Sequence, residues 1–323
     1  MPYTIDVHLS PEEVRSQMRA DALEGLQGET KSIPPVWFYD ERCSRLFEEI
    51  TQLPEYYPTR AERALLEAHA PSIAELSKAD TLVELGAGAC EKTRVLLSAL
   101  QETGSLSRYV PFDISDEFLR SAATTLSKEF GSLDIHLVIG DFHHHLAEIP
   151  TEGRRMVAFL GGTIGNLDPG QRARFLFDLN CTMSSDDSLL LGTDLVKDRS
   201  RLVAAYDDSA GVTADFNRNV LLVLNEQLGG DFDPDLFRHL AVWNEDEQWI
   251  EMRLRAAEAN EVSLTGAGIT VRFDEGEDLL TEISAKFTPE RVERELSAAG
   301  FVIEGMWGAE GGEFLLTLAH PFC

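Results

Sequence analysis

Residues 81–94, Thr-Leu-Val-Glu-Leu-Gly-Ala-Gly-Ala-Cys-Glu-Lys-Thr-Arg, constrain the fold of this chain more than any other stretch. The apolar run at 82–85 predicts a buried strand, and Gly86-Ala87-Gly88 follows it as a turn. Apolar residues at 95–97 and 100 then have the spacing of a helix. In α/β sheets, a strand, a glycine turn and a helix bring bare backbone close to a nucleotide-like ligand. The stretch therefore predicts a ligand site at the end of a strand.

Glu91 decides which class of nucleotide-like ligand suits this turn. The dinucleotide fingerprint G-x-G-x-x-G and the Walker A loop G-x-x-x-x-G-K-[ST] both require glycine at this position. A glutamate there would repel the phosphates of either ligand. S-adenosylmethionine carries a sulfonium group and no phosphate, so the turn favours this cofactor over the other two.

The net charge of the chain limits the kinds of molecule that it can be expected to bind. Its 28 Lys and Arg residues against 56 Asp and Glu residues give a net charge of −28. Such a field repels nucleic acid and anionic membranes. We therefore expect a small-molecule substrate and no nucleic-acid or membrane partner. We also expect a monomer, although the charge does not bear on the oligomeric state.

The N-terminus and the cysteines indicate a cytoplasmic protein. Residues 1–8 show no basic region followed by an apolar stretch, so we expect no signal peptide. No window approaches the ~18 apolar residues that span a bilayer. The four cysteines lie far apart without C-x-x-C spacing, which argues against a disulfide framework or a zinc site.

Further apolar runs recur at the spacing of alternating strands and helices. The strand candidates are Arg108–Asp113, Ile135–Ile139, Met156–Leu160 and Ser188–Gly192, and the helical patterns are Glu117–Phe130, His144–Ile149 and Pro169–Asn180. This alternation predicts an α/β fold with a mostly parallel sheet and helices on both faces. Ligands collect at the carboxyl ends of such strands, where Gly86, Asp113, Asp141 and Gly161 would cluster.

The C-terminal region predicts the end of the same sheet. Thr288 would cap a helix that has Pro289 at its first position and Gly300 after its end. Two strand candidates follow, Phe301–Trp307 and Glu313–Ala319. This helix and hairpin resemble the finish of the class I (Rossmann-like) methyltransferase sheet.

The segment 196–285 is far longer than a normal connection, so it should form structure of its own. Aromatic clusters at 37–39 and 56–57 predict core residues that could pack with it. We expect an S-adenosylmethionine-binding domain at 61–195 and 286–323. A second, discontinuous substrate-binding cap domain would comprise 1–60 and 196–285.

Candidates for cofactor binding stand at strand ends and near the start of the first helix. Asp113 could accept the ribose hydroxyls of an adenosine. Asp141 could accept the adenine amino group while the Phe142 ring packs on the base. Lys92 could pair with the methionine carboxylate. A solvated charge is the alternative for Asp113, which the glycine turn upstream makes less favoured, and a lysine such as Lys92 is by itself more often a solvated charge.

Other polar residues could contact a substrate. Asn166 offers a donor and an acceptor beside the expected methyl group, although a loop asparagine without a role is an equal alternative. Glu282 and Ser284 share one face of a predicted strand, opposite Ile283, and could read a pair of substrate N–H groups. A solvated strand face is the alternative there. His143-His144-His145 does not indicate a metal site, because adjacent side chains do not converge on one ion.

Over about 25–320 the chain resembles the histidine-specific (histidine Nα-) methyltransferases of ergothioneine biosynthesis. The resemblance depends on long strings that are far more specific than the glycine turn. They are Lys31-Ser-Ile-Pro-Pro-Val-Trp-Phe-Tyr-Asp40, Leu53-Pro-Glu-Tyr-Tyr-Pro-Thr-Arg60, Val83–Arg94, Phe159-Leu-Gly-Gly-Thr-Ile-Gly-Asn-Leu167, Gly192-Thr-Asp-Leu-Val-Lys-Asp198, Tyr206-Asp-Asp-Ser-Ala-Gly-Val-Thr213, Phe216-Asn-Arg-Asn219 and Leu280-Thr-Glu-Ile-Ser284. Ala87, Ala89 and Cys90 stand where relatives often have Ser or Thr, which could remove one hydrogen bond to the cofactor.

The resemblance implies three methyl transfers from S-adenosylmethionine to the α-amine of L-histidine, which give the trimethyl betaine hercynine. It also implies roles by position. The cofactor-binding residues would be Gly86, Lys92, Asp113, Asp141 and Phe142. The residues at the α-amino and carboxylate groups of histidine would be Tyr56, Asn166 and Tyr206, with Tyr39 near the amine. The residues at the imidazole would be Glu282, Ser284 and Met252.

The chemistry of methyl transfer suits these residue types. An in-line displacement at a sulfonium carbon needs a neutral amine, and a carboxylate against that amine would hold it protonated. Polar, uncharged neighbours such as Tyr39 and Asn166 therefore suit the catalytic position.

Three alternatives stay open. A methyltransferase of another small amine or amino acid would keep the sheet and change only the cap. A P-loop nucleotide hydrolase would bind ATP with magnesium, and a non-catalytic sensor would bind S-adenosylmethionine without transferring its methyl group.

Overall fold

The computed structural model describes residues 3–38, 40–88, 90, 92–309 and 311–322. The chain divides into two compact units. Unit 1 comprises Met1–Leu9, Pro58–Val196 and Lys286–Cys323, and unit 2 comprises Ser10–Tyr57 and Lys197–Ala285. These bounds differ from the predicted domains chiefly at residues 1–9, which fall in unit 1. The assignment of separate cofactor and substrate domains stays a prediction.

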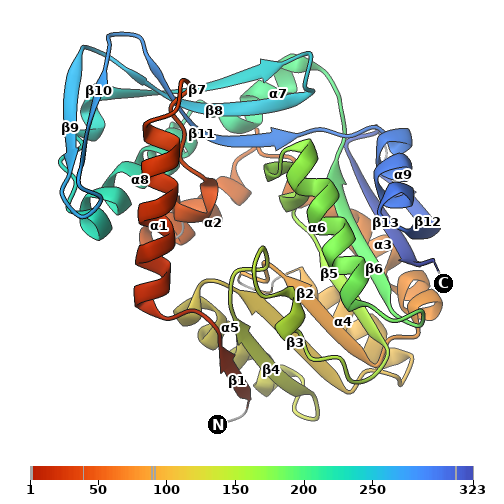
Figure 1. Ribbon diagram of the computed structural model, residues 1–323. Helices are drawn as coiled ribbons and strands as arrows, with labels where there is room; N and C mark the ends of the chain where they lie inside the picture. Colours follow the sequence, from red (N-terminus) through yellow and green to blue (C-terminus); the bar gives the residue numbers. More distant parts are fainter. Residues whose placement is uncertain (1–2, 39, 89, 91, 310, 323) are drawn as a thin grey trace. The chain divides into compact units, whose positions relative to one another are not determined.

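Unit 1 is built on one eight-stranded sheet (Figure 1). Its order is β1-β4-β3-β2-β5-β6-β13-β12. The strands are β1 (Thr4–Val7), β2 (Thr81–Leu85), β3 (Arg108–Asp113), β4 (Asp134–Ile139), β5 (Arg155–Phe159), β6 (Ser188–Asp194), β12 (Phe301–Gly308) and β13 (Phe314–Pro321). The first six in this order are parallel, and β13 is antiparallel to both β6 and β12. The predicted α/β fold with a Rossmann-like sheet is confirmed, whereas β1 was not predicted.

Successive strands are added to the sheet on one side of β2 and then on the other. From β2 it continues outward through β3 and β4, and then returns to the other side of β2 for β5 and β6. Every residue of β2, β5 and β6 is buried, as expected for parallel strands covered on both faces. The carboxyl ends of β2 and β5 therefore flank a topological switch point, where α/β sheets bind their ligands.

Helices pack against this sheet. Residues of α3 (Pro58–Ser77), α4 (Thr93–Glu102) and α5 (Asp116–Glu129) share one buried cluster with the strands. Helix α6 (Pro169–Thr182) lies on the near side of the sheet in Figure 1 and contacts α9 (Pro289–Ala298). The helices predicted around α5 and α6 are confirmed. The helix predicted at 144–149 is only the 3-10 turn η2 (Leu146–Glu148).

Helix α9 begins with the capping chemistry that its sequence predicts. The Thr288 hydroxyl accepts the Arg291 N–H at 3.2 Å, and Pro289 stands at the first helical position. Gly300 follows the helix with a φ of 84°, in the left-handed region that glycine enters readily. The hairpin of β12 and β13 then completes the sheet.

Residues 197–285 leave unit 1 and return to it at one place. The Val196 N–H donates to the Phe287 carbonyl at 2.9 Å, and the Phe287 N–H donates to the Asp194 carbonyl at 2.8 Å. The neighbouring residues Lys286 and Asp194 also form a buried ion pair, with 2.9 Å between Nζ and Oδ2. The two ends of the segment are therefore held next to each other by residues of unit 1 that end or follow β6 and precede α9.

Unit 2 combines helices with small antiparallel sheets. Its helices are α1 (Pro11–Leu26), η1 (Pro35–Phe38), α2 (Glu41–Gln52), α7 (Arg199–Tyr206), α8 (Val212–Leu228) and η4 (Pro234–Leu236). Its strands are β7 (Phe237–Asn244), β8 (Trp249–Ala256) and β11 (Asp278–Ala285), in the order β11-β8-β7, and the hairpin β9 (Asn260–Leu264) and β10 (Ile269–Phe273). The aromatic residues Trp37, Phe38, Tyr56 and Tyr57 are buried, which confirms their predicted place in a core.

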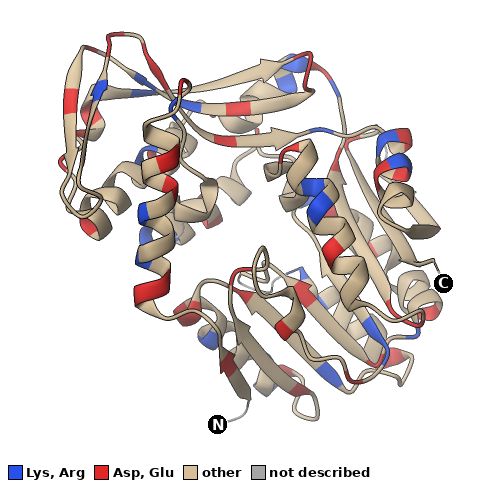
Figure 2. Ribbon diagram, in the orientation of Figure 1, with Lys and Arg blue, Asp and Glu red and all other residues tan. Residues whose placement is uncertain are grey.

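Acidic residues are scattered over the elements of both units in Figure 2, and they do not gather in one tail. Within the described residues, no helix is long and apolar enough to cross a membrane. The same residues contain no group of three or more His, Cys, Asp or Glu placed to hold a metal ion. Cys43, Cys90 and Cys181 are free thiols.

Candidate functional site

The glycine turn leaves backbone bare at the end of β2. Gly86 and Gly88 have φ values of 69° and 50°, which glycine adopts at little cost. A Cβ atom added at either position would meet no atom within 4 Å. The Gly86 N–H donates to the Phe112 carbonyl at 2.8 Å, which fixes the turn beside β3. The turn therefore gives a ligand close access to the backbone; Ala89 and Glu91 lie outside the described residues.

Asp113 holds the glycine turn from the neighbouring strand. Its Oδ2 accepts the Gly88 N–H at 2.9 Å, and its Oδ1 accepts the Ser115 N–H at 2.9 Å. Burial raises the pKa of this carboxyl above its ordinary value, and the backbone N–H groups act against that shift. A carboxylate has about four lone-pair sites, so capacity is left for two ribose hydroxyls. The geometry fits the predicted role of Asp113, which stays a prediction.

Asp141 and Phe142 follow β4, the next strand. The Asp141 carboxylate accepts the His143 N–H at 2.8 Å and a hydrogen bond from His144 Nδ1 at 2.9 Å. The Phe142 ring lies edge-on to the Phe159 ring, with 5.3 Å between the centroids. These contacts hold the loop after β4 on the same edge of the sheet as the glycine turn.

Lys92 is not a solvated charge. Its Nζ forms an ion pair with the carboxylate of Glu62, and the Glu62 side chain is completely buried in α3. Asn166 ends the 3-10 helix η3 (Thr163–Asn166), which follows Gly161 and Gly162 after β5. Lys92 and Asn166 therefore stand on the two loops that flank the switch point.

A second buried carboxylate, Glu84, lies on β2 just before the turn. It accepts hydrogen bonds from the hydroxyls of Thr93 and Tyr109, the latter at 2.6 Å. Burial raises the pKa of Glu84 to about 7, against the opposing effect of these hydrogen bonds. The carboxyl therefore titrates close to neutral pH directly below the glycine turn.

In unit 2, three of the predicted substrate residues are in contact. The Tyr206 hydroxyl and the Ser284 Oγ are 2.7 Å apart. The Tyr56 and Tyr206 rings meet edge to face, with 6.2 Å between their centroids. All three residues are buried. Tyr39, predicted to lie near the amine, is outside the described residues.

Glu282 and Met252 are directly opposite each other on β11 and β8. The register shifts between Leu280 and Glu282, so a bulge at Thr281 sets which residues face β8. Side chains paired in this way have Cβ atoms about 4.5–5.5 Å apart. Glu282 is also near Cys43: burial raises the pKa of that thiol, and the carboxylates of Asp40 and Glu282 raise it further. The structure thus brings Met252 and Glu282 together, while their contact with a substrate stays a prediction.

A buried chain of polar groups supports this region, and the sequence did not point to it. The Thr281 hydroxyl donates to Asn217 Oδ1 at 2.6 Å, and Asn217 Nδ2 donates to His239 Nδ1 at 2.9 Å. His239 Nε2 donates to the Tyr206 carbonyl at 2.7 Å. Because a carbonyl can only accept, the proton is assigned to Nε2. Burial lowers the pKa of His239, which keeps the ring neutral. The chain connects the bulge before Glu282 with the end of α7 at Tyr206.

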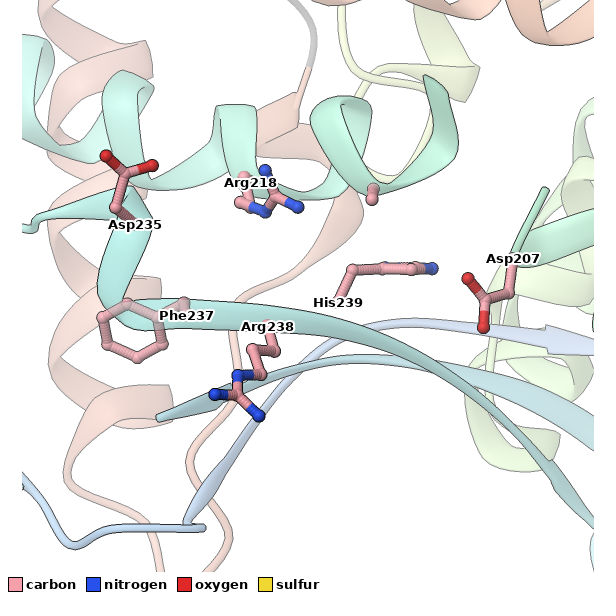
Figure 3. Close-up of a pocket in the computed structure, with 7 residues that line it drawn as sticks. Asp207, Arg218, Asp235, Phe237, Arg238 and His239 are labelled. Atoms are coloured by element: carbon pink, nitrogen blue, oxygen red, sulfur yellow. The ribbon is translucent and has the colours of Figure 1, made fainter. Parts of the chain in front are cut away.

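A pocket of about 310 Å³ lies on unit 2 beside this chain (Figure 3). Figure 3 shows the His239 ring pointing from β7 toward Asp207. The other lining residues are Ala214, Arg218, Asp235, Phe237 and Arg238. The residues predicted to bind histidine are not among those that line this pocket.

Comparison with known proteins gives relatives over nearly the whole chain. A family described as "Histidine-specific methyltransferase, SAM-dependent" matches residues 18–321. Histidine N-alpha-methyltransferase of Mycobacterium tuberculosis is 52% identical over 319 residues, 99% of each chain. The protein of the same name from Mycolicibacterium smegmatis is 50% identical over 319 residues, also 99% of each chain. Ergothioneine biosynthesis protein 1 of Neurospora crassa is 29% identical over 295 residues, 89% of this chain and 33% of that protein.

Proposed function

We propose a reaction from the premise that this chain belongs to the histidine-specific, S-adenosylmethionine-dependent methyltransferase family. The chain is an enzyme that transfers methyl groups from S-adenosylmethionine to the α-amino nitrogen of L-histidine. Three successive transfers give hercynine, on the way to ergothioneine. The observation that carries this proposal is the identity of 50% and 52% to two proteins named histidine N-alpha-methyltransferase, over 99% of each chain.

The residues around the glycine turn fit S-adenosylmethionine. Gly86 offers bare backbone beside open space, and Asp113 has acceptor capacity for the ribose hydroxyls. Lys92 offers an ammonium to the methionyl carboxylate, while Asp141 and Phe142 would hold the adenine. When bound, this cofactor supplies a methyl group on a positively charged sulfur, which makes the methyl carbon electrophilic.

The polar residues of unit 2 fit histidine. Tyr56 and Tyr206 would hold its α-amino and carboxylate groups. The Ser284 hydroxyl, 2.7 Å from that of Tyr206, and the Glu282 carboxylate would bind the imidazole. Met252, opposite Glu282, would line the same side of the ring.

The amine must be neutral before each transfer, because only then does the nitrogen have a lone pair. As the C–N bond forms, the C–S bond breaks and its electron pair stays on sulfur. The α-ammonium of histidine loses one proton before the first transfer, and the first two transfers each release another from nitrogen; water is the acceptor that we propose. Tyr39 and Asn166 would orient the amine without holding it protonated, and alignment alone contributes several kcal/mol to such a displacement.

Mass spectrometry of the protein incubated with S-adenosylmethionine and L-histidine tests the proposal. We expect a product heavier than histidine by three methyl groups, and none when either substrate is left out. A product that stops at one or two methyl groups would contradict hercynine formation. Methylation of another amine, with histidine unchanged, would favour the alternative substrate.

We also propose that the enzyme acts as a monomer in the cytoplasm, without a nucleic-acid or membrane partner. The net charge of −28 supports the absence of anionic partners. Sedimentation at micromolar concentration tests the oligomeric state, and a dimer would contradict the proposal.

A further inference from the structure

Glu62 is a fully buried carboxylate to which the proposed mechanism gives no role. It stands near the start of α3, and 0% of its surface is exposed. Its Oε1 accepts the Gly161 N–H at 2.7 Å, and its Oε2 binds Lys92 Nζ. One carboxylate therefore ties the loop of the glycine turn to the loop that leads from β5 to Asn166.

The surroundings of Glu62 leave space for its carboxylate. A Cβ atom on Gly192 of β6 would lie 2.3 Å from Glu62 Oε1 and 3.2 Å from Phe314 Cε1. Gly161 has a φ of 77°, and a Cβ atom there would lie 3.5 Å from Lys92 Nζ. Glycine at 192 is thus required by the carboxylate itself, rather than by a turn.

Packing alone does not account for this ion pair. A buried carboxylate is unfavourable unless both oxygens are partnered, and an apolar residue of similar size often stabilises a fold at least as well. The Lys92 side chain remains 24% exposed, in contrast to Glu62. The buried carboxylate is therefore paired with a lysine whose side chain is partly exposed.

We propose that Glu62 is a positioning residue for the methyl donor. It directs the Lys92 ammonium toward the carboxylate at the methionyl end of the cofactor and fixes the Gly161 backbone beside it. An ammonium has three N–H donors, so a bond to Glu62 leaves two for a ligand. The inference rests on the proposed function in one respect, that Lys92 receives the methionyl carboxylate.

Glu62→Gln tests the inference, because no orientation of an amide satisfies both partners. If its oxygen accepts from Gly161, its NH₂ group faces the Lys92 ammonium; if it is turned round, the Gly161 N–H loses its acceptor. Calorimetry would compare S-adenosylhomocysteine with 5′-methylthioadenosine, which lacks the amino-acid end. We expect affinity for the first to fall about 10- to 100-fold and for the second to change less than about twofold. Equal losses for both ligands, or no loss for either, would overturn the proposal.

Two further variants keep the test decisive. Asp187→Asn removes one partner of another buried ion pair of unit 1, Arg155 with Asp187 at 2.6 Å, and should leave the ratio of the two affinities unchanged. Gly192→Ala displaces the Glu62 carboxylate without changing its charge, and should reproduce the selective loss if Glu62→Gln does not fold. An unchanged ratio in Gly192→Ala would also overturn the proposal.

This test does not depend on methyl transfer. If the parent protein leaves histidine unmodified, the proposed function fails while the ratio of affinities still decides the role of Glu62. If the parent methylates histidine and the ratio is unaffected, the role of Glu62 alone is wrong.

Discussion

Glu282 is the residue whose replacement separates histidine recognition from methyl transfer in general. A hydrogen bond between its carboxylate and an imidazole N–H contributes about 1.5–3 kcal/mol. Glu282→Ala should therefore weaken histidine binding about 10- to 150-fold in calorimetry, with cofactor binding unchanged. The histidine affinity of Glu282→Gln should lie between that of the parent and that of Glu282→Ala. Glu261→Ala, on strand β9, is the matched control, and parent-like histidine binding by Glu282→Ala would show that the imidazole is bound elsewhere.

Glu84 makes the stability of the fold depend on pH. Burial raises the pKa of Glu84 from 4.5 to about 7, so the folded protein binds a proton more tightly than the unfolded chain. Stability from this group is thus fully present below about pH 4.5 and is lost as the pH rises to about 7. We therefore compare the free energy of unfolding of the parent with that of Glu84→Gln. The parent value minus the variant value should fall by at most about 3 kcal/mol as the pH rises over this range. Denaturant unfolding at several pH values measures the difference, and a constant or rising difference would contradict the shift.

At the scale of elements, the bulge in β11 depends on one hydroxyl. Thr281 is 1% exposed, and its Oγ1 lies 2.6 Å from Asn217 Oδ1 and 2.9 Å from the Met252 carbonyl. Thr281→Val leaves the Asn217 oxygen without this donor in a dry site, so the free energy of unfolding should fall by about 1–3 kcal/mol. Thr270→Val, on the exposed face of β10, should change it by less than about 0.5 kcal/mol. Equal effects of the two variants would mean that the bulge does not depend on this contact.

The elements that the sequence predicted are those with strong local patterns. Strands β2 to β6 are apolar runs, and α9 has its cap Thr288 directly before Pro289. Strand β1 was missed because it has four residues, Thr-Ile-Asp-Val, and shows no buried run. The bulge in β11 was also missed, since it depends on Asn217, which is 64 positions away in the chain.

At the scale of the whole molecule, the two ligands should order different parts of the chain. S-adenosylhomocysteine should slow hydrogen exchange at 85–92 and 108–115, because we propose that it binds there. L-histidine, added to that complex, should slow exchange around Tyr206 and at 280–285. Mass spectrometry of peptic fragments resolves these segments. Protection by histidine confined to unit 1 would contradict the assignment of Tyr206, Glu282 and Ser284 to substrate binding.

The part of the site that could be predicted is again the part with a local sequence pattern. Asp113 and Asp141 are recognisable because Asp113 is the last residue of the apolar strand β3 and Asp141 stands two residues after β4. The roles of Tyr56 and Tyr206 came from the family resemblance, Ser284 was indicated by strand alternation, and the structure places the three in contact. Glu62 resembles any helical glutamate in sequence. Its burial depends on Gly161, 99 residues further on, and on Gly192, so no local pattern indicates it.

The adjacent ends of 197–285 have a consequence for engineering and for evolution. Because Val196 and Phe287 are joined by a backbone hydrogen bond, a foreign segment of any length needs only two neighbouring attachment points. Insertions whose ends meet in this way are tolerated best, since they do not stretch the host. Exchange of 197–285 would therefore replace the proposed imidazole-binding residues Met252, Glu282 and Ser284 in one step, while Tyr39 and Tyr56 stay with the host sequence.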